Sequence, residues 1–115
     1  MLFRSCFGTP CKDYEAYFLT LKSRGPEETR ILPVQYSGVM GFHRLAINGV
    51  ENGSQPMKQN GVYWMCNGEI YNWKELGQSK SQSDCEVIGE LYEKYGTGMF
   101  QLLDGVFAKI GRAHV

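Results

Sequence analysis

Residues 57–72, MKQNGVYWMCNGEIYN, decide how the middle of the chain folds. Asn60-Gly61 stands between two short runs with strand character. It predicts a two-residue hairpin turn, because both central residues of such a turn need a positive φ. We predict a strand from Val62 to Cys66, a run rich in β-branched and aromatic residues. Asn67-Gly68 follows that strand directly and predicts a second sharp turn.

Two amphipathic helices are predicted, one on each side of this stretch. The first follows Asp13 and ends at Gly25-Pro26, because proline disfavours helix in the residue before it. The second begins with a capping box of Ser83 and Glu86 and ends at Gly96. The predicted apolar faces are Tyr14, Tyr17, Phe18 and Leu21 in the first helix, and Val87, Ile88, Leu91, Tyr92 and Tyr95 in the second.

The remaining segments read mainly as strands. We predict strands over residues 2–7, 31–36, 39–47 and 102–110, and a short helix over residues 72–76. Because the helices are few and strands lie between them, this order predicts an α+β fold with helices packed on a mainly antiparallel sheet.

The composition excludes several classes of protein. The chain has 115 residues with no net formal charge, 43% of them hydrophobic and 21% charged. This predicts one domain over residues 1–115 and excludes a disordered chain. Balanced charge argues against nucleic acid or an anionic membrane as partner, and no apolar run reaches the roughly 18 residues that cross a bilayer. The start of the chain lacks the apolar core of a signal peptide, so we expect a cytoplasmic protein.

The four cysteines, at positions 6, 11, 66 and 85, are expected to be reduced thiols in the interior or close to it. A zinc site could be drawn with His43 or His114, but the spacing fits no usual template. We therefore expect no metal and no cofactor.

Polar residues form four clusters at predicted strand ends and helix starts. They are residues 23–27 (SRGPE), 42–45 (FHRL), 67–72 (NGEIYN) and 83–86 (SDCE). Each alone has a plain structural explanation. Arg24 and Arg44 could be surface or strand-edge cations, and acids such as Asp84 are favoured in the first turn of any helix.

Taken together, the clusters resemble the N-terminal glutaminase domain of glutamine-dependent asparagine synthetases, a class II glutamine amidotransferase of the N-terminal-nucleophile (Ntn) hydrolase type. RGPE is similar to the family's RGPD, FHRLAI to its arginine-containing strand, and Gln55-Pro56 to its QP. NGEIYN and SDCEVI match without a change, and LDGVFA matches LxGxFA. The resemblance covers roughly residues 1–112. It implies an αββα sandwich of mainly antiparallel strands.

The resemblance also implies a role for each site residue. Arg44 would hold the α-carboxylate of L-glutamine or a similar amino acid, for which a guanidinium is well shaped. Asp84 and Glu69 would face the α-ammonium. The side-chain amide of Asn67 and the backbone N–H of Gly68 would form the oxyanion hole. Two further residues, Arg24 and Glu27, would support the site without touching the substrate.

The start of the chain departs from the family. There the nucleophile is a cysteine directly after the initiator methionine, and its own α-amine is the base. Here the chain reads Met1-Leu2, and aligning Phe7-Gly8 with the end of the family's first strand puts Met1 at the nucleophile's position. A thioether has no proton to lose.

Three interpretations follow for the activity. The chain is a catalytically impaired pseudoenzyme that binds glutamine as a regulatory module, or an interaction protein with the same fold. Alternatively, removal of a leader, MLFRS, exposes Cys6 as the nucleophile of an active enzyme that converts glutamine to glutamate and ammonia. The third interpretation is an incomplete, functionless gene product.

The C-terminal end also departs from the family. The family's domain continues beyond Gly111-Arg112, and the sequence holds no SGGxDS-like stretch of an ATP-dependent synthetase domain, which in the family completes asparagine biosynthesis. We expect a shortened domain whose open sheet edges favour a homo-oligomer or a separate synthetase partner.

Overall fold

The structure, a computed structural model, describes residues 2–6, 12–34, 38–45, 53–78, 80 and 82–114. The strands are β1 (Leu2–Cys6), β2 (Glu28–Val34), β3 (Gly38–Arg44), β4 (Met57–Gln59), β5 (Val62–Ile70) and β6 (Gly105–His114). The α-helices are α1 (Tyr14–Leu19), α2 (Trp73–Leu76) and α3 (Val87–Tyr95). Three short 3₁₀ helices are η1 (Lys22–Arg24), η2 (Asp84–Glu86) and η3 (Gly96–Gln101).

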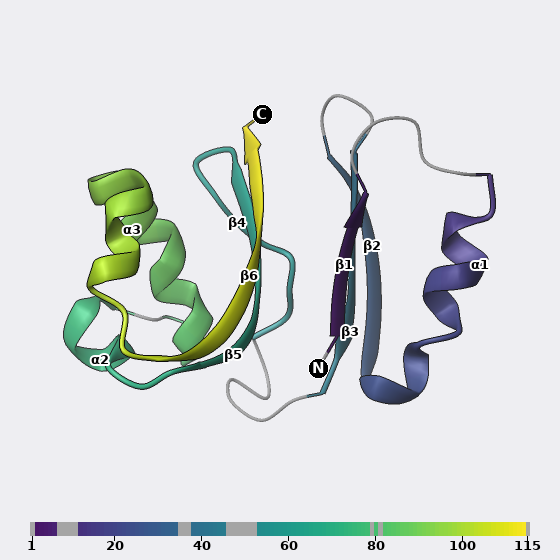
Figure 1. The fold of residues 1–115 in the computed structure, drawn as a ribbon, viewed down its shortest axis with the longest axis horizontal. Coiled ribbons are helices and arrows are strands. Elements are labelled where there is room, and N and C mark those ends of the chain that lie inside the picture. The colour runs from purple at the N-terminus through teal and green to yellow at the C-terminus, as the bar shows by residue number, and fades with distance from the viewer. Residues whose placement is uncertain are drawn as a thin grey trace.

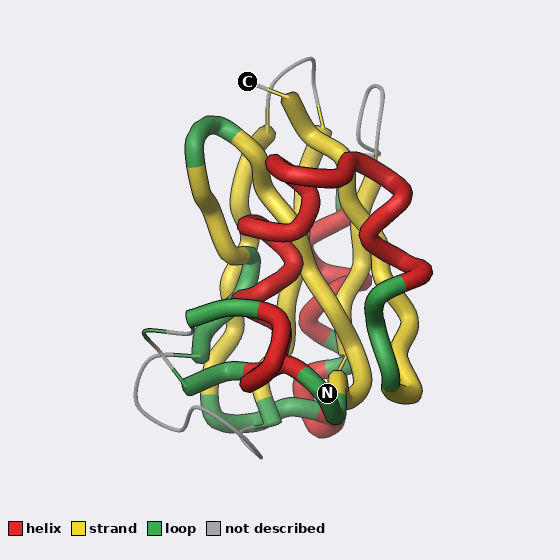
Figure 2. Tube along the Cα trace, turned by 90° about the vertical axis from the view of Figure 1, so that its left-hand side faces the viewer, coloured by secondary structure: helices red, strands yellow, loops and turns green. Residues whose placement is uncertain are grey.

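The described strands form two antiparallel sheets, in the orders β1-β3-β2 and β4-β5-β6. Figure 1 shows the two sheets beside each other, with α1 outside the first and with α2 and α3 outside the second. Figure 2 looks from the side of α2 and α3, which lie in front of the strands. The α+β class predicted from the sequence is confirmed.

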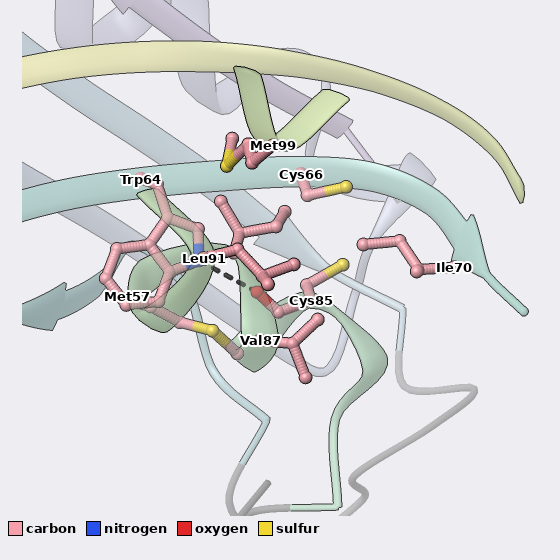
Figure 3. Packing of buried hydrophobic residues seen from close by; sticks show 9 residues of the cluster. Met57, Trp64, Cys66, Ile70, Cys85, Val87, Leu91 and Met99 are labelled. Atoms are coloured by element: carbon pink, nitrogen blue, oxygen red, sulfur yellow. Dashed lines mark hydrogen bonds between the residues drawn. The ribbon is translucent and has the colours of Figure 1, made fainter. Parts of the chain in front are cut away.

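Strand β5 contributes to two hydrophobic cores because its side chains alternate between its faces. Trp64, Cys66 and Ile70 point toward α3 and pack with residues such as Met99 (Figure 3). Met65 lies on the opposite face and packs with Met40 and Phe42 of β3, and all three of these side chains are buried. A core therefore joins the two sheets, and a larger one joins β5 to the helices. The members of the larger core are Met57, Trp64, Cys66, Ile70, Cys85, Val87, Ile88, Leu91 and Met99.

Helix α1 is fixed to the first sheet through a buried histidine. The ring of His43 stacks on that of Phe18, with centroids 4.0 Å apart. His43 Nε2 lies 2.8 Å from the Phe18 carbonyl oxygen, which can only accept, so Nε2 carries a proton. The other ring nitrogen, Nδ1, lies 3.0 Å from the Thr29 hydroxyl. Both ring nitrogens of His43 are thus hydrogen-bonded within the protein.

Helix α1 differs from its sequence prediction in which aromatic side chain it buries. The spacing predicts that Tyr17 and Phe18 both lie on the buried face, but Phe18 is 8% exposed and Tyr17 is 67% exposed. The helix ends at Leu19, and its buried residue is Phe18, whose ring lies over Gly41, where an added Cβ would lie 2.8 Å from that ring. The buried stripe is therefore narrower than the spacing suggests, and its prediction at Tyr17 is wrong.

This difference can be tested with a pair of alanine variants. Phe18→Ala is expected to lower the free energy of unfolding by about 3 kcal/mol, because it leaves a cavity beside His43. Tyr17→Ala, the matched control one position away, is expected to change it by less than about 0.5 kcal/mol. Urea unfolding followed by circular dichroism measures both. Equal losses would contradict the packing of α1 described here.

The hairpin prediction at Asn60-Gly61 is confirmed, whereas the turn prediction at Asn67-Gly68 is wrong. The first pair has φ values of 46° and 79° and joins β4 to β5. The second pair lies within β5, opposite Ala108 and Phe107 of β6. Gly68 has a φ of +141°, and an added Cβ would overlap the Val106 carbonyl oxygen and lie 2.5 Å from the Phe107 Cα. Glycine here permits a close approach of two strands.

The capping box predicted at Ser83 is also wrong. Ser83 directly precedes η2, but its side chain makes no capping hydrogen bond. The Glu86 N–H donates instead to the Ser83 carbonyl oxygen at 3.2 Å, which forms a 3₁₀ turn before α3 begins at Val87. The predicted end of this helix at Gly96 is confirmed, with a φ of 56° at that residue. Within the described residues, no helix is long and apolar enough to span a bilayer.

Candidate functional site

Arg44 is the last residue of β3, and its guanidinium contacts two polar side chains. Nη1 donates to the Ser54 hydroxyl oxygen at 3.2 Å and lies 3.8 Å from Glu28 Oε2. The Ser54 hydroxyl in turn donates to Glu28 Oε2. Arg44 is only 8% exposed, and a cation this deeply buried requires such polar partners.

The RGPE segment lies against the backbone of Arg44. Pro26 forms an isolated parallel bridge with Arg44, and the Glu27 N–H donates to the Arg44 carbonyl oxygen at 3.2 Å. A Cβ added at Gly25 would overlap the His43 carbonyl, so only glycine allows this close approach. The side chains of Arg24 and Glu27 are exposed. RGPE therefore holds the backbone of the strand that carries Arg44.

Gln55 connects this arginine to the second sheet. Its side chain is buried, and its Oε1 accepts from the Cys66 N–H at 2.6 Å while its Nε2 donates to the Cys66 carbonyl oxygen at 3.0 Å. Both backbone groups of Cys66 are thus held directly before Asn67-Gly68. Because Ser54 and Gln55 are consecutive, one short segment contacts Arg44 on the first sheet and β5 on the second.

The three residues that follow Cys66 differ in exposure. Asn67 is half-buried, while Gly68 and Glu69 are exposed. They lie opposite Ala108, Phe107 and Val106 of β6, so β6 fixes the backbone from which the predicted oxyanion hole would be built.

Asp84 is held against the same strand, three residues further on. Its carboxylate is buried, and Oδ2 accepts from the Ile70 N–H at 2.7 Å. A hydrogen bond from a backbone N–H to a carboxylate is short and strong. This hydrogen bond places η2 at the end of β5. The structure therefore brings Asp84 to the strand of Asn67, Gly68 and Glu69, with one of its oxygens engaged by the backbone.

The thiols of Cys66 and Cys85 are neighbours in the interior. Both are buried and reduced, as the sequence predicts, and Figure 3 shows their sulfur atoms on the same side of the core beside Ile70. The hydrogen bond with Cys66 raises the pKa of the Cys85 thiol, and burial and the nearby Asp84 carboxylate raise it further. Cys85 therefore stays protonated and is a structural residue.

Because the pKa of Cys85 is raised, the free energy of unfolding is expected to fall at alkaline pH. The folded protein keeps the Cys85 proton while the unfolded chain loses it above its ordinary pKa of 9.0, so the unfolded state binds fewer protons there. The contribution of protonated Cys85 to the free energy of unfolding is therefore fully present below pH 9.0. It is lost as the pH rises above that value, by about 1.4 kcal/mol per pH unit. Urea unfolding between pH 7 and 10.5 tests this, roughly over the range where a thiol titrates. Cys85→Ala should unfold with a flatter pH profile, and identical slopes would contradict the assignment.

The structure does not bring Cys6 to the arginine. Cys6 ends β1 and pairs with Val39, whereas Leu2 at the other end of β1 pairs with His43, the residue before Arg44. The strand thus separates Cys6 from the guanidinium by its whole length. Met1 and Cys11, on which other expectations rested, lie outside the described residues.

No local pattern in the sequence predicts that Glu28 and Ser54 contact Arg44, because a glutamate after RGPE and a serine in a loop are both common surface residues. Gln55 was noted only as part of the QP pair. Among the residues that the structure describes, no group of three or more His, Cys, Asp or Glu side chains is arranged to hold a metal ion.

Comparisons with known proteins agree with the resemblance. The model of a family described as "Glutamine amidotransferase domain" matches residues 7–110. The chain is 40% identical over 96 residues to asparagine synthetase (glutamine-hydrolyzing) 2 of Oryza sativa subsp. japonica, covering 76% of this chain and 16% of the relative. It is 40% identical over 93 residues to the protein of the same name in Bacillus subtilis, covering 74% of this chain and 12% of the relative. The chain thus spans less than a fifth of the length of these relatives.

Proposed function

Because this chain belongs to the glutamine amidotransferase domain family, we propose that it binds L-glutamine between Arg44 and the Asn67-Gly68 segment of β5. The observation that carries the proposal is the Ser54-Gln55 link. Ser54 contacts the Arg44 guanidinium, and Gln55 holds Cys66, which directly precedes Asn67. A ligand with a carboxylate at one end and an amide at the other fits two such anchor points.

Each end of glutamine has a residue suited to it. The α-carboxylate binds the Arg44 guanidinium, which presents a planar fork of donors. The α-ammonium faces the carboxylates of Asp84 and Glu69. The side-chain amide oxygen of the ligand accepts from the Asn67 side chain and the Gly68 N–H, the arrangement that would stabilise an oxyanion.

We further propose that the domain binds glutamine without hydrolysing it. Hydrolysis needs a thiolate at the ligand's amide carbon, a thioester formed as ammonia leaves, and water to release glutamate. Leu2 stands at the end of β1 that lies beside His43 and Arg44, and the cysteine of that strand, Cys6, stands at the far end. The cysteine of β1 therefore lies away from the end of the strand where the ligand would bind.

The proposal also includes the architecture. Residues 1–115 form a single αββα domain of the Ntn-hydrolase type, which functions in the cytoplasm and assembles with a second copy or with a separate synthetase. Among the described residues, the outer strands β1, β2, β4 and β6 each pair on one side only, which supports assembly because unpaired strand edges readily accept another chain. A monomeric mass by light scattering at micromolar concentration would contradict the second copy.

Calorimetry and a glutamate-release assay test binding and hydrolysis separately. L-Glutamine is expected to bind and D-glutamine to bind more weakly, with no glutamate formed above the buffer rate. Intact-mass analysis after treatment with 6-diazo-5-oxo-L-norleucine, an electrophilic glutamine analogue, should show no adduct. Absence of L-glutamine binding would overturn the proposed function. A mapped adduct on Cys6 would instead support the active enzyme with a removed leader.

A further inference from the structure

Glu28 places a carboxylate where a ligand's carboxylate would bind. It is the first residue of β2 and lies directly opposite Arg44 in the antiparallel pair, so the two side chains share one face of the sheet. Glu28 Oε2 lies 3.8 Å from Arg44 Nη1 and also accepts from the Ser54 hydroxyl. The guanidinium is therefore engaged by a carboxylate of the chain itself.

The same carboxylate has a second cation within reach. Glu28 Oε1 lies 4.0 Å from Arg30 Nε, two residues along the same strand. The Arg44 side chain is 10% exposed, whereas those of Glu28 and Arg30 are 37% and 41% exposed. Glu28 thus lies between a buried arginine and a partly exposed one, and it can turn toward solvent without losing its counter-ion.

We propose that the Glu28 carboxylate contacts the Arg44 guanidinium in the free protein and competes there with the α-carboxylate of glutamine. When the ligand binds, the Glu28 carboxylate moves to Arg30. This inference rests on the proposed function, since it takes Arg44 as the carboxylate anchor. Two carboxylates beside one guanidinium repel each other, and the repulsion is strong where solvent is partly excluded. The pair Glu28 and Arg30 therefore determines how tightly the domain holds a carboxylate ligand.

The inference predicts opposite effects for two single substitutions. Glu28→Gln keeps the shape of the side chain but removes its charge, and it should bind L-glutamine about tenfold more tightly. Arg30→Ala removes the cation that receives Glu28, and it should bind about threefold more weakly. Both effects should shrink in 0.5 M NaCl, roughly the range in which exposed charges are screened.

A ligand without a carboxylate is the matched control. Isothermal titration with L-glutamine and with 4-aminobutanamide, which keeps the amine and amide, should show the Glu28→Gln gain for glutamine alone. If Glu28 instead positions Arg44 or contacts the α-ammonium, Glu28→Gln will weaken glutamine binding, and that result overturns the inference. An equal gain for both ligands overturns it as well.

A second probe separates this inference from the proposed function. Sodium acetate is titrated against protein labelled with ¹⁵N, and the Arg44 guanidinium signal is followed by NMR. Half-maximal shifts should occur at lower acetate in Glu28→Gln than in the unmodified protein. If glutamine does not bind but this difference is present, the proposed function fails and the competition stands. If glutamine binds at Arg44 but neither probe responds to Glu28→Gln, only the competition fails.

Discussion

Arg44→Ala is expected to weaken L-glutamine binding by about a hundredfold or more, because a carboxylate loses a charge-assisted partner in a largely buried position. Arg44 is only 8% exposed, and its guanidinium already contacts Ser54 and Glu28, so its orientation is set before a ligand arrives. Calorimetry with L-glutamine measures the loss. The variant should still fold, since Glu28 retains Arg30 as a counter-ion.

Lys94→Ala is the matched control for this substitution. It removes one positive charge from an exposed residue of α3 that pairs with Glu90 at 2.8 Å, far along the chain from the site. Glutamine affinity should be unchanged in this variant. If Arg44→Ala binds as well as Lys94→Ala while both unfold at similar urea concentrations, Arg44 is not the carboxylate anchor.

The dipeptide Asn-Gly shows what could be predicted from the sequence and what could not. Asn60-Gly61 forms the predicted hairpin because the two strands that it joins are adjacent in the chain, so local preference and pairing agree. Asn67-Gly68 has the same local preference but lies within β5, because β6 pairs with it from about forty residues later in the chain. Only the long-range pairing distinguishes the two.

In the candidate site too, the sequence predicts some features, and others depend on contacts between distant segments. Arg44 and Asp84 stand in segments that resemble a family, and this resemblance predicts that they are site residues. The roles of Glu28, Ser54 and Gln55 depend on contacts across 10 to 26 residues of sequence, which no local pattern carries. The segment resemblance therefore predicts which residues belong to the site, and the structure shows how the guanidinium and the Cys66 backbone are held.

Gly68→Ala is expected to lower the free energy of unfolding by about 4 kcal/mol or more, the largest effect that we predict for a small substitution. Two costs add. A φ of +141° is strained for any residue with a Cβ, and the added methyl group would overlap the Val106 carbonyl and lie 2.5 Å from the Phe107 Cα. Both neighbours are atoms of paired strands and cannot move aside as a flexible side chain could. The strands β5 and β6 would have to separate.

Gly98→Ala isolates this cost from the general effect of replacing a glycine. An added Cβ at Gly98 meets no atom within 4 Å, so its stability should change by less than about 0.5 kcal/mol. Urea unfolding compares the two variants, and calorimetry then asks whether Gly68→Ala still binds L-glutamine under conditions where it is folded. Because the substitution moves the N–H that is proposed to face the ligand's amide oxygen, binding should fall even there. A Gly68→Ala protein with the stability of Gly98→Ala would contradict the close approach of β5 and β6. A folded Gly68→Ala protein with full glutamine affinity would contradict the proposed place of the Gly68 N–H.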